Sequence, residues 1–214
     1  DNYPLFILRG LTASQLAEKR KETLVKYGLL PDYLSAYEEA DATQNFLNGL
    51  QNYPLLKGMQ ANLYKCFLPQ AWSLGTPGTG VVAFLHPEGI YDDPKGGSFR
   101  EAVYPRLRYH FQFQNEMQLF PIGNRNKFSI NIYKGSSTTD QSIKIQLITN
   151  IFIPSTVDSC FDHSSQGPVP GIKDENNKWS INGHRDRIIK VGKNELSLFA
   201  RLYDVPGTPP LHAR

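Results

Sequence analysis

The sequence lacks several features that would assign it to a specialised class of protein. Its 214 residues include two cysteines, Cys66 and Cys160. Two are too few for a disulfide framework or for a zinc site, which needs about four ligands. No apolar run approaches the roughly 20 residues of a membrane-spanning helix. These absences favour a cytoplasmic protein with no membrane partner, in which we expect both thiols to be buried as small hydrophobes.

The usual catalytic motifs are also missing. We find no Walker-type phosphate loop, no Gly-x-Gly-x-x-Gly, no nucleophile elbow and no His-Glu-x-x-His. The five histidines are scattered, and we interpret the compact pairs Asp162-His163 and His184-Arg-Asp186 as structural or solvated groups and not as metal ligands. These 214 residues therefore do not assemble a complete active site by themselves.

What is present is the composition of a globular protein with many turns. Hydrophobic residues make up 40% and charged residues 20%, which argues against a disordered chain. Fifteen prolines and 17 glycines predict short elements. The net charge of +3 permits nucleic-acid binding but does not predict it, because a phosphate-binding surface depends on clustered charge.

The first third of the chain has helical character. Thr12 followed by Gln15 is a capping-box pattern, and Pro31 suits the first turn of a second helix. Residues 62–74 resume helical spacing, and Pro69 predicts a kink or a helix in two parts.

The rest of the chain predicts an α/β fold. Val81 to Leu85 is apolar on both faces, which is typical of a strand inside a parallel sheet covered by helices. A helix from Ser98 to about Arg108 follows, and then two alternating strands whose short connection predicts an antiparallel hairpin. The remaining expected elements are the strands 109–114 and 128–133, an apolar run at 143–153, an irregular stretch at 158–183, a short strand at 188–191 and a helix at 194–203.

Five short motifs occur in an informative order. They are Asn62-Leu-Tyr-Lys-Cys-Phe67, Gly80-Val-Val-Ala-Phe-Leu-His-Pro87, Phe99-Arg-Glu-Ala-Val-Tyr-Pro-Arg-Leu-Arg108, Leu119-Phe-Pro121 and the strand Lys127 to Tyr133. Together they resemble the second half of the catalytic domain of gamma-ordered N6-adenine DNA methyltransferases, especially the methylase portion of large type II restriction-modification polypeptides. The resemblance covers residues 60–135. It implies a partial Rossmann-like methyltransferase fold, the latter half of its sheet with an antiparallel hairpin, preceded by a helical segment.

The resemblance also implies roles for four residues. Phe67 falls where the family places a Phe against the adenine of S-adenosylmethionine, the implied cofactor. Phe120, before Pro121, falls where an aromatic ring stacks on the flipped target adenine of double-stranded DNA. Arg125 and Lys127 would then face DNA.

Each residue has a plainer interpretation that stays open. Phe67 is spaced like a core residue, Phe120 could simply close the hairpin, and Arg125 and Lys127 could belong to an ordinary solvated loop. His86 and Glu88 flank Pro87 at a strand end, where ligand sites occur in α/β sheets, but we expect them to be local hydrogen-bonding groups.

The departures from the family pattern lie upstream of the matched motifs. No Asn- or Asp-Pro-Pro-aromatic catalytic loop is present, and neither is the family's Gly-rich cofactor loop. We therefore expect an internal fragment, inactive alone, that works with the rest of its parent polypeptide. Its expected parts are a helical insertion at 1–60, the latter half of the catalytic domain at 61–135, and an extension toward target recognition at 136–214.

Two other functions remain open. The chain could be a non-catalytic DNA- or protein-interaction module of a bacterial defence system that keeps a methylase-like core as a scaffold. It could also be an unrelated α/β enzyme, which predicts no binding to DNA.

Overall fold

A computed structural model describes residues 10–135 and 142–214. The chain divides into two compact units, residues 1–49 and residues 50–214, and each is described by itself. The first unit holds helices α1 (Ala13–Lys26) and α2 (Leu30–Asn48). The predicted capping box is confirmed, because Thr12 Oγ1 accepts from the Gln15 N–H and Gln15 Oε1 accepts from the Thr12 N–H. Pro31 lies in the first turn of α2, as predicted.

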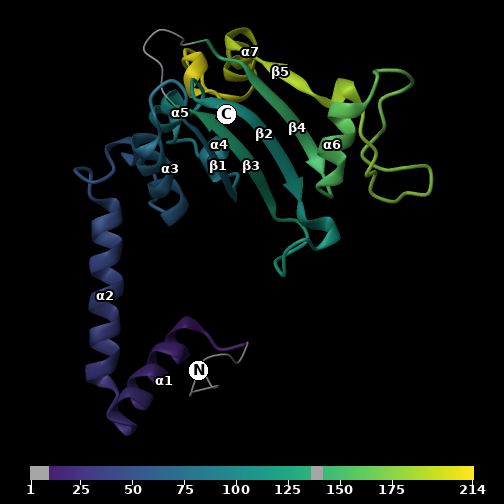
Figure 1. The fold of residues 1–214 in the computed structure, drawn as a ribbon. Helices are drawn as coiled ribbons and strands as arrows, with labels where there is room; N and C mark the ends of the chain where they lie inside the picture. The colour runs from purple at the N-terminus through teal and green to yellow at the C-terminus, as the bar shows by residue number, and fades with distance from the viewer. Residues whose placement is uncertain (1–9, 136–141) are drawn as a thin grey trace. The chain divides into compact units, whose positions relative to one another are not determined.

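The second unit is built around a five-stranded mixed sheet (Figure 1). Its strands are β1 (Val81–Pro87), β2 (Leu107–Gln114), β3 (Lys127–Lys134), β4 (Ile145–Ile151) and β5 (Ile189–Val191). Their spatial order is β1-β3-β2-β4-β5. The predicted α/β class is confirmed, and so is the predicted antiparallel hairpin of β2 and β3. Strands from residues 61–135 and from residues 136–214 share this one sheet.

The position of β1 differs from the prediction. It was expected inside a parallel sheet, but it lies at one edge and pairs antiparallel with β3. Val81 and Leu85 are 68% and 52% exposed, whereas His86 on the other face is buried. Hydrophobicity on both faces therefore does not mark a central strand here.

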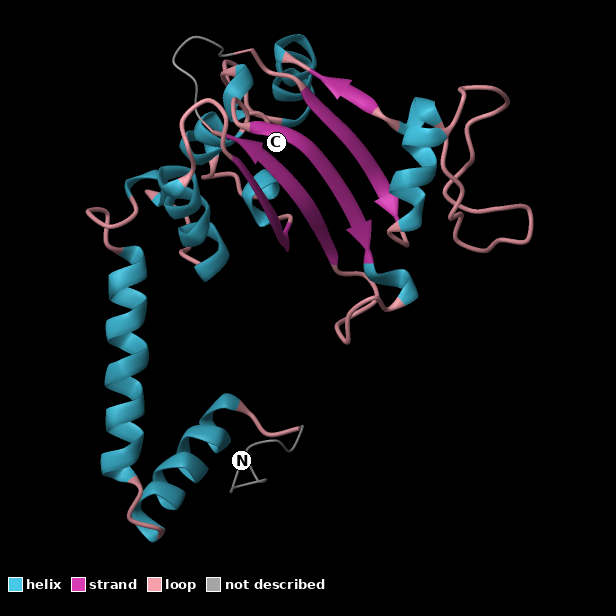
Figure 2. Cartoon of the chain, in the orientation of Figure 1, coloured by secondary structure: helices cyan, strands magenta, loops and turns pink. Residues whose placement is uncertain are grey.

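The helices of this unit are short (Figure 2). They are α3 (Leu63–Leu74), α4 (Gly89–Asp92), α5 (Gly97–Val103), α6 (Ser155–Asp162) and α7 (Lys193–Tyr203). Pro69 lies inside α3, which is one helix and not two. The helix that was expected to run from Ser98 to about Arg108 ends at Val103, and β2 begins at Leu107. The stretch 158–183 was expected to be irregular, but α6 begins at Ser155 and extends into it.

The core lies on both faces of the sheet. On one face, Phe111, Phe113 and Phe128 cluster with Ile148, Ile151 and Cys160 of α6. On the other, Trp72 of α3 contacts Phe99 and Tyr133, at ring-centroid distances of 5.8 and 5.6 Å. Cys66 and Cys160 are both buried and free, as predicted.

Candidate functional site

Three strand ends meet at one edge of the sheet. β1 and β2 both pair antiparallel with β3, and β4 pairs parallel with β2, so β1, β2 and β4 run in the same direction. Their carboxyl ends therefore lie side by side along one end of the sheet, called the carboxyl edge below. Open α/β sheets bind ligands at this end. The segment after β1 carries Glu88 and α4, and the loop 115–126 follows β2.

The loop 115–126 is held by one buried amide. Asn115 is fully buried, and its Nδ2 donates to the carbonyl oxygens of Phe120 and Ile122, each at 3.0 Å. In return, its Oδ1 accepts from the Phe120 N–H at 3.1 Å. A side chain that bonds both polar groups of residue 120 fixes the backbone there, so the loop presents Phe120 in a defined position.

The Phe120 ring is partly packed and partly open. It meets Phe128 edge to face at 5.0 Å between ring centroids, and Phe128 in turn stacks on Phe113 at 5.5 Å. Phe120 is nevertheless 38% exposed. It thus helps to close the hairpin and still offers aromatic surface at the carboxyl edge.

The predicted cations lie on the same loop and at the start of β3. Arg125 and Lys127 are both exposed. Among the residues that the structure describes, no carboxylate forms an ion pair with either of them. Their charges are therefore available to an anionic partner.

Phe67 does not belong to the core. It is 55% exposed, and it shares the outer face of α3 with Leu63, while Leu68 and Trp72 are buried on the inner face. This exposure excludes the interpretation of Phe67 as a core residue. Its contact with the adenine of a cofactor stays a prediction. An exposed phenyl ring fits one wall of an adenine-binding site.

The sequence did not single out a buried polar network under this edge. His110 Nε2 lies 3.3 Å from Glu88 Oε2, and Gln112 Nε2 donates to the same oxygen at 2.8 Å. His110 Nδ1 donates to Asn131 Oδ1 at 2.7 Å, and that oxygen also accepts from the Tyr91 hydroxyl at 2.7 Å. The His110 ring therefore lies between the Glu88 carboxylate and the Asn131 amide oxygen.

Glu88 is ionised within this network. Burial by itself would raise the pKa of its carboxyl, but the hydrogen bond and positive charge of His110, aided by Ser129 and Gln112, lower that pKa to about 2. A cavity of about 190 Å³ lies against Glu88, His110 and Gln112. The network ties the segment after β1 to β2 and β3.

His86 supports the same edge from β1. Its Nδ1 lies 2.8 Å from the Pro87 carbonyl oxygen and its Nε2 lies 3.0 Å from the Tyr133 hydroxyl. Because the carbonyl can only accept, Nδ1 carries the proton and Nε2 accepts from Tyr133. Burial lowers the pKa of His86, which agrees with a neutral ring. Tyr64 of α3 stacks on that ring at 5.3 Å. His86 and Glu88 are thus hydrogen-bonding groups, as expected.

A weak signal for this network was present in the sequence. His110 and Gln112 alternate with the aromatic residues of β2, and Ser129 and Asn131 alternate with Phe128 and Ile130 of β3. All four are uncharged or weakly basic hydrogen-bonding residues. On a solvent-facing strand we would expect Lys or Glu, so the absence of strong charge indicated a buried polar face.

No protein-family model matches the chain, and a search of curated proteins finds no match either. Within residues 10–135 and 142–214, no three His, Cys, Asp or Glu side chains gather in a way that could hold a metal ion. No helix in the same ranges is long and apolar enough to cross a membrane. The function proposed below therefore rests on the residues and the geometry.

Proposed function

We propose that this chain supplies the adenine-stacking and DNA-contacting half of an N6-adenine DNA methyltransferase domain in a cytoplasmic restriction-modification polypeptide. The observation that carries the proposal is the exposed Phe120 ring, held by Asn115 at the carboxyl edge and followed by a cationic loop. The predicted motif order supports the same assignment.

The chemistry explains why such a ring is useful. The N6 amine of adenine lies inside the duplex stack, so the enzyme must extrude the base before it can act. An extruded base needs a flat partner, and stacking on an aromatic ring contributes about 1–3 kcal/mol per base. Phe120 would provide that partner, and Arg125 and Lys127 would contact the phosphates on either side of the extruded nucleotide.

The methyl group would come from S-adenosylmethionine. Phe67 would hold the cofactor's adenine ring from α3, whose Tyr64 already packs against His86 of β1. The loop that activates the target amine, Asn- or Asp-Pro-Pro-aromatic in this family, is not part of these 214 residues. We therefore expect DNA binding and base stacking from the chain alone, and no methylation.

The direct test uses DNA in which the base is already extruded. Fluorescence anisotropy would compare a duplex that carries one bulged adenine with the same duplex fully paired. Because the bulge removes the cost of extrusion, we expect the bulged duplex to bind about 5- to 100-fold more tightly. Phe120→Ala should abolish that preference and largely spare binding to the paired duplex. Ile122→Ala removes an exposed side chain from the same loop and should keep the preference.

A preference that survives Phe120→Ala would contradict the stacking role. The non-catalytic interaction module predicts a different result, in which duplex binding depends on Arg125 and Lys127 but the bulge has no effect. In the intact parent, Phe120→Ala should lower methylation. Phe67→Ala should weaken S-adenosylmethionine binding there, with Leu63→Ala on the same helix face as the control.

A further inference from the structure

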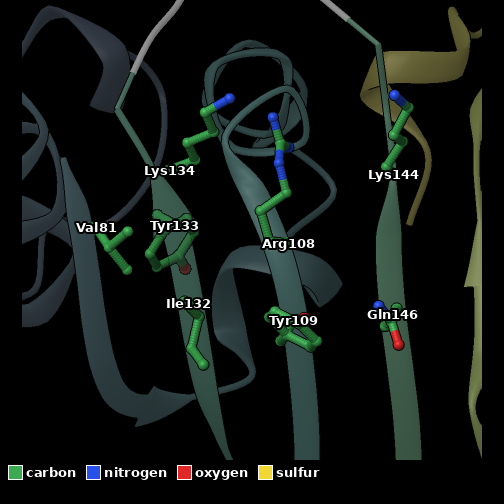
Figure 3. Close-up of a pocket in the computed structure, with 8 residues that line it drawn as sticks. All are labelled: Val81, Arg108, Tyr109, Ile132, Tyr133, Lys134, Lys144 and Gln146. Atoms are coloured by element: carbon green, nitrogen blue, oxygen red, sulfur yellow. The ribbon is translucent and has the colours of Figure 1, made fainter. Parts of the chain in front are cut away.

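A cavity of about 370 Å³ lies at the amino-terminal ends of β1, β2 and β4, opposite to the Phe120 loop. Arg108 at the start of β2, Lys134 at the end of β3 and Lys144 just before β4 line it. Their side chains extend toward the same end of the sheet (Figure 3). Adjacent strands are about 4.8 Å apart, so these three residues start from backbone positions within about 10 Å of one another.

The three cations have no acidic partner in the part of the chain that the structure describes. Arg108 donates through one guanidinium nitrogen, Nη1, to the carbonyl oxygens of Pro105 and Leu107, at 2.9 and 3.0 Å. Those two bonds hold its stem in place and leave the other guanidinium nitrogens for a further acceptor. Within residues 10–135 and 142–214, no carboxylate lines the cavity, so the described part of the site presents positive charge.

The floor of the cavity has the opposite character. It is formed by Val81 of β1, Ile132 of β3 and the ring of Tyr109 of β2 (Figure 3). Tyr109 is held by Phe111 and Phe161, at 5.7 and 6.3 Å between ring centroids, so this surface is fixed. Val81 is 68% exposed on the edge strand, which leaves the cavity open on that side.

We propose that this cavity binds a nucleotide-class ligand, with phosphate groups on Arg108, Lys134 and Lys144 and a flat apolar body on Val81, Tyr109 and Ile132. The volume falls within the range of small-molecule sites. The separation of charge from apolar surface matches a ligand that has one end of each kind. The inference does not depend on the proposed function, because no residue of the Phe120 loop takes part.

The test is a calorimetric titration of the full chain with adenosine diphosphate at low ionic strength. We expect saturable binding of one ligand per chain. The double variant Lys134→Gln, Lys144→Gln should raise the Kd about tenfold or more, since it removes two charge-assisted contacts. Its matched control is Lys57→Gln, Lys178→Gln, which makes the same charge change at exposed lysines outside the cavity and should leave the Kd within about twofold.

A second pair of variants tests the floor without touching a cation. Val81→Asp places a carboxylate in the cavity and should raise the Kd by about tenfold or more. Leu85→Asp makes the same kind of change on the same face of β1, outside the cavity, and should not. Both positions are exposed, so both variants should fold.

Several outcomes would overturn the proposal. Absence of saturable binding would do so, as would equal losses in the control variants, which would show a diffuse charge effect. If inorganic pyrophosphate binds with the same Kd as adenosine diphosphate, the apolar floor does not contribute to ligand binding. A DNA duplex that displaces the nucleotide, and loses affinity with the same substitutions, would assign the cavity to a phosphodiester backbone instead.

Discussion

The helical unit and the sheet unit are stabilised in different ways. Neither α1 nor α2 contains a buried residue, and Val25, Leu34 and Phe46 are exposed. In the sheet unit, Leu68, Ile90 and Phe99 are completely buried. The first unit therefore depends on local signals such as the Thr12 capping box, whereas the second depends on contacts between residues distant in sequence.

The difference has a measurable consequence. A helix without burial is only marginally stable, because tertiary packing supplies most helical stability in proteins. We expect α1 and α2 to melt gradually and the sheet unit to unfold cooperatively. Both tryptophans, Trp72 and Trp179, lie in the sheet unit, so their fluorescence reports that unit alone, while far-ultraviolet circular dichroism also senses the helices.

The largest expected effect comes from Arg100 in the sheet unit. Its side chain is 1% exposed and donates to four carbonyl oxygens, among them Asp93 at 2.7 Å and His212 at 2.9 Å. Arg100→Ala leaves buried acceptors unpaired and opens a cavity, so the free energy of unfolding should fall by about 3–5 kcal/mol. Urea unfolding followed by tryptophan fluorescence measures this loss.

The control for Arg100 is Arg201→Ala, an exposed arginine of α7. It should change the free energy of unfolding by less than about 0.5 kcal/mol. Equal effects of the two variants would mean that Arg100 does not join the segment after β1 to the end of the chain.

Glu88 makes the stability of the sheet unit depend on pH. Its pKa is about 2 in the folded protein, below the ordinary value of 4.5. Its stabilising contribution is therefore complete above about pH 4.5 and is lost as the pH falls toward 2. A pKa difference of this size corresponds to about 3 kcal/mol.

Glu88→Gln should remove that part of the pH dependence, as measured by urea unfolding between pH 6 and pH 3. Glu18→Gln, in exposed α1, should keep the slope of the unmodified protein. If Glu88→Gln also keeps that slope, the network does not stabilise the ionised carboxylate.

The variant Asn115→Ala tests whether the Asn115 side chain holds the loop 115–126 in place. Asn115→Ala removes the side-chain bonds to Phe120 and Ile122 and should lower the free energy of unfolding by about 1–3 kcal/mol. The loosened loop should be cut by trypsin after Arg125 and Lys127 faster than in the unmodified protein. Unchanged cleavage rates would show that Asn115 does not hold the loop.

The sequence predicted best what is decided locally. The Thr12 capping box, the hairpin of β2 and β3, and the helix ending at Tyr203 all follow from spacing within a few residues. The edge position of β1 could not be predicted, because a strand's neighbours are chosen by residues far along the chain. α6 was missed because its eight residues are too few to give a clear period.

The candidate site was predictable in the same partial way. The sequence singled out Phe120, Arg125 and Lys127 through a motif, and the structure adds that Phe120 is exposed and held by Asn115. The Glu88, His110 and Asn131 network joins the segment after β1 to β2 and β3. The alternation of polar and aromatic residues in β2 and β3 indicated a buried polar face, but only the packed sheet shows which of these polar groups meet.

The smallest expected effect, in the helical unit, tests the comparison most directly. Thr12→Ala deletes the hydroxyl that accepts from the Gln15 N–H, which should destabilise α1 by about 1 kcal/mol. Because α1 has no buried residue to compensate, the ellipticity at 222 nm should fall and its melting should begin at a lower temperature. The midpoint of tryptophan fluorescence should not move, because both tryptophans lie in the other unit. Lys21→Ala, an exposed residue in the middle of α1, is the control and should leave the ellipticity nearly unchanged. A shift of the fluorescence midpoint in Thr12→Ala would mean that the two units unfold together, and the contrast between local and long-range stabilisation would be wrong.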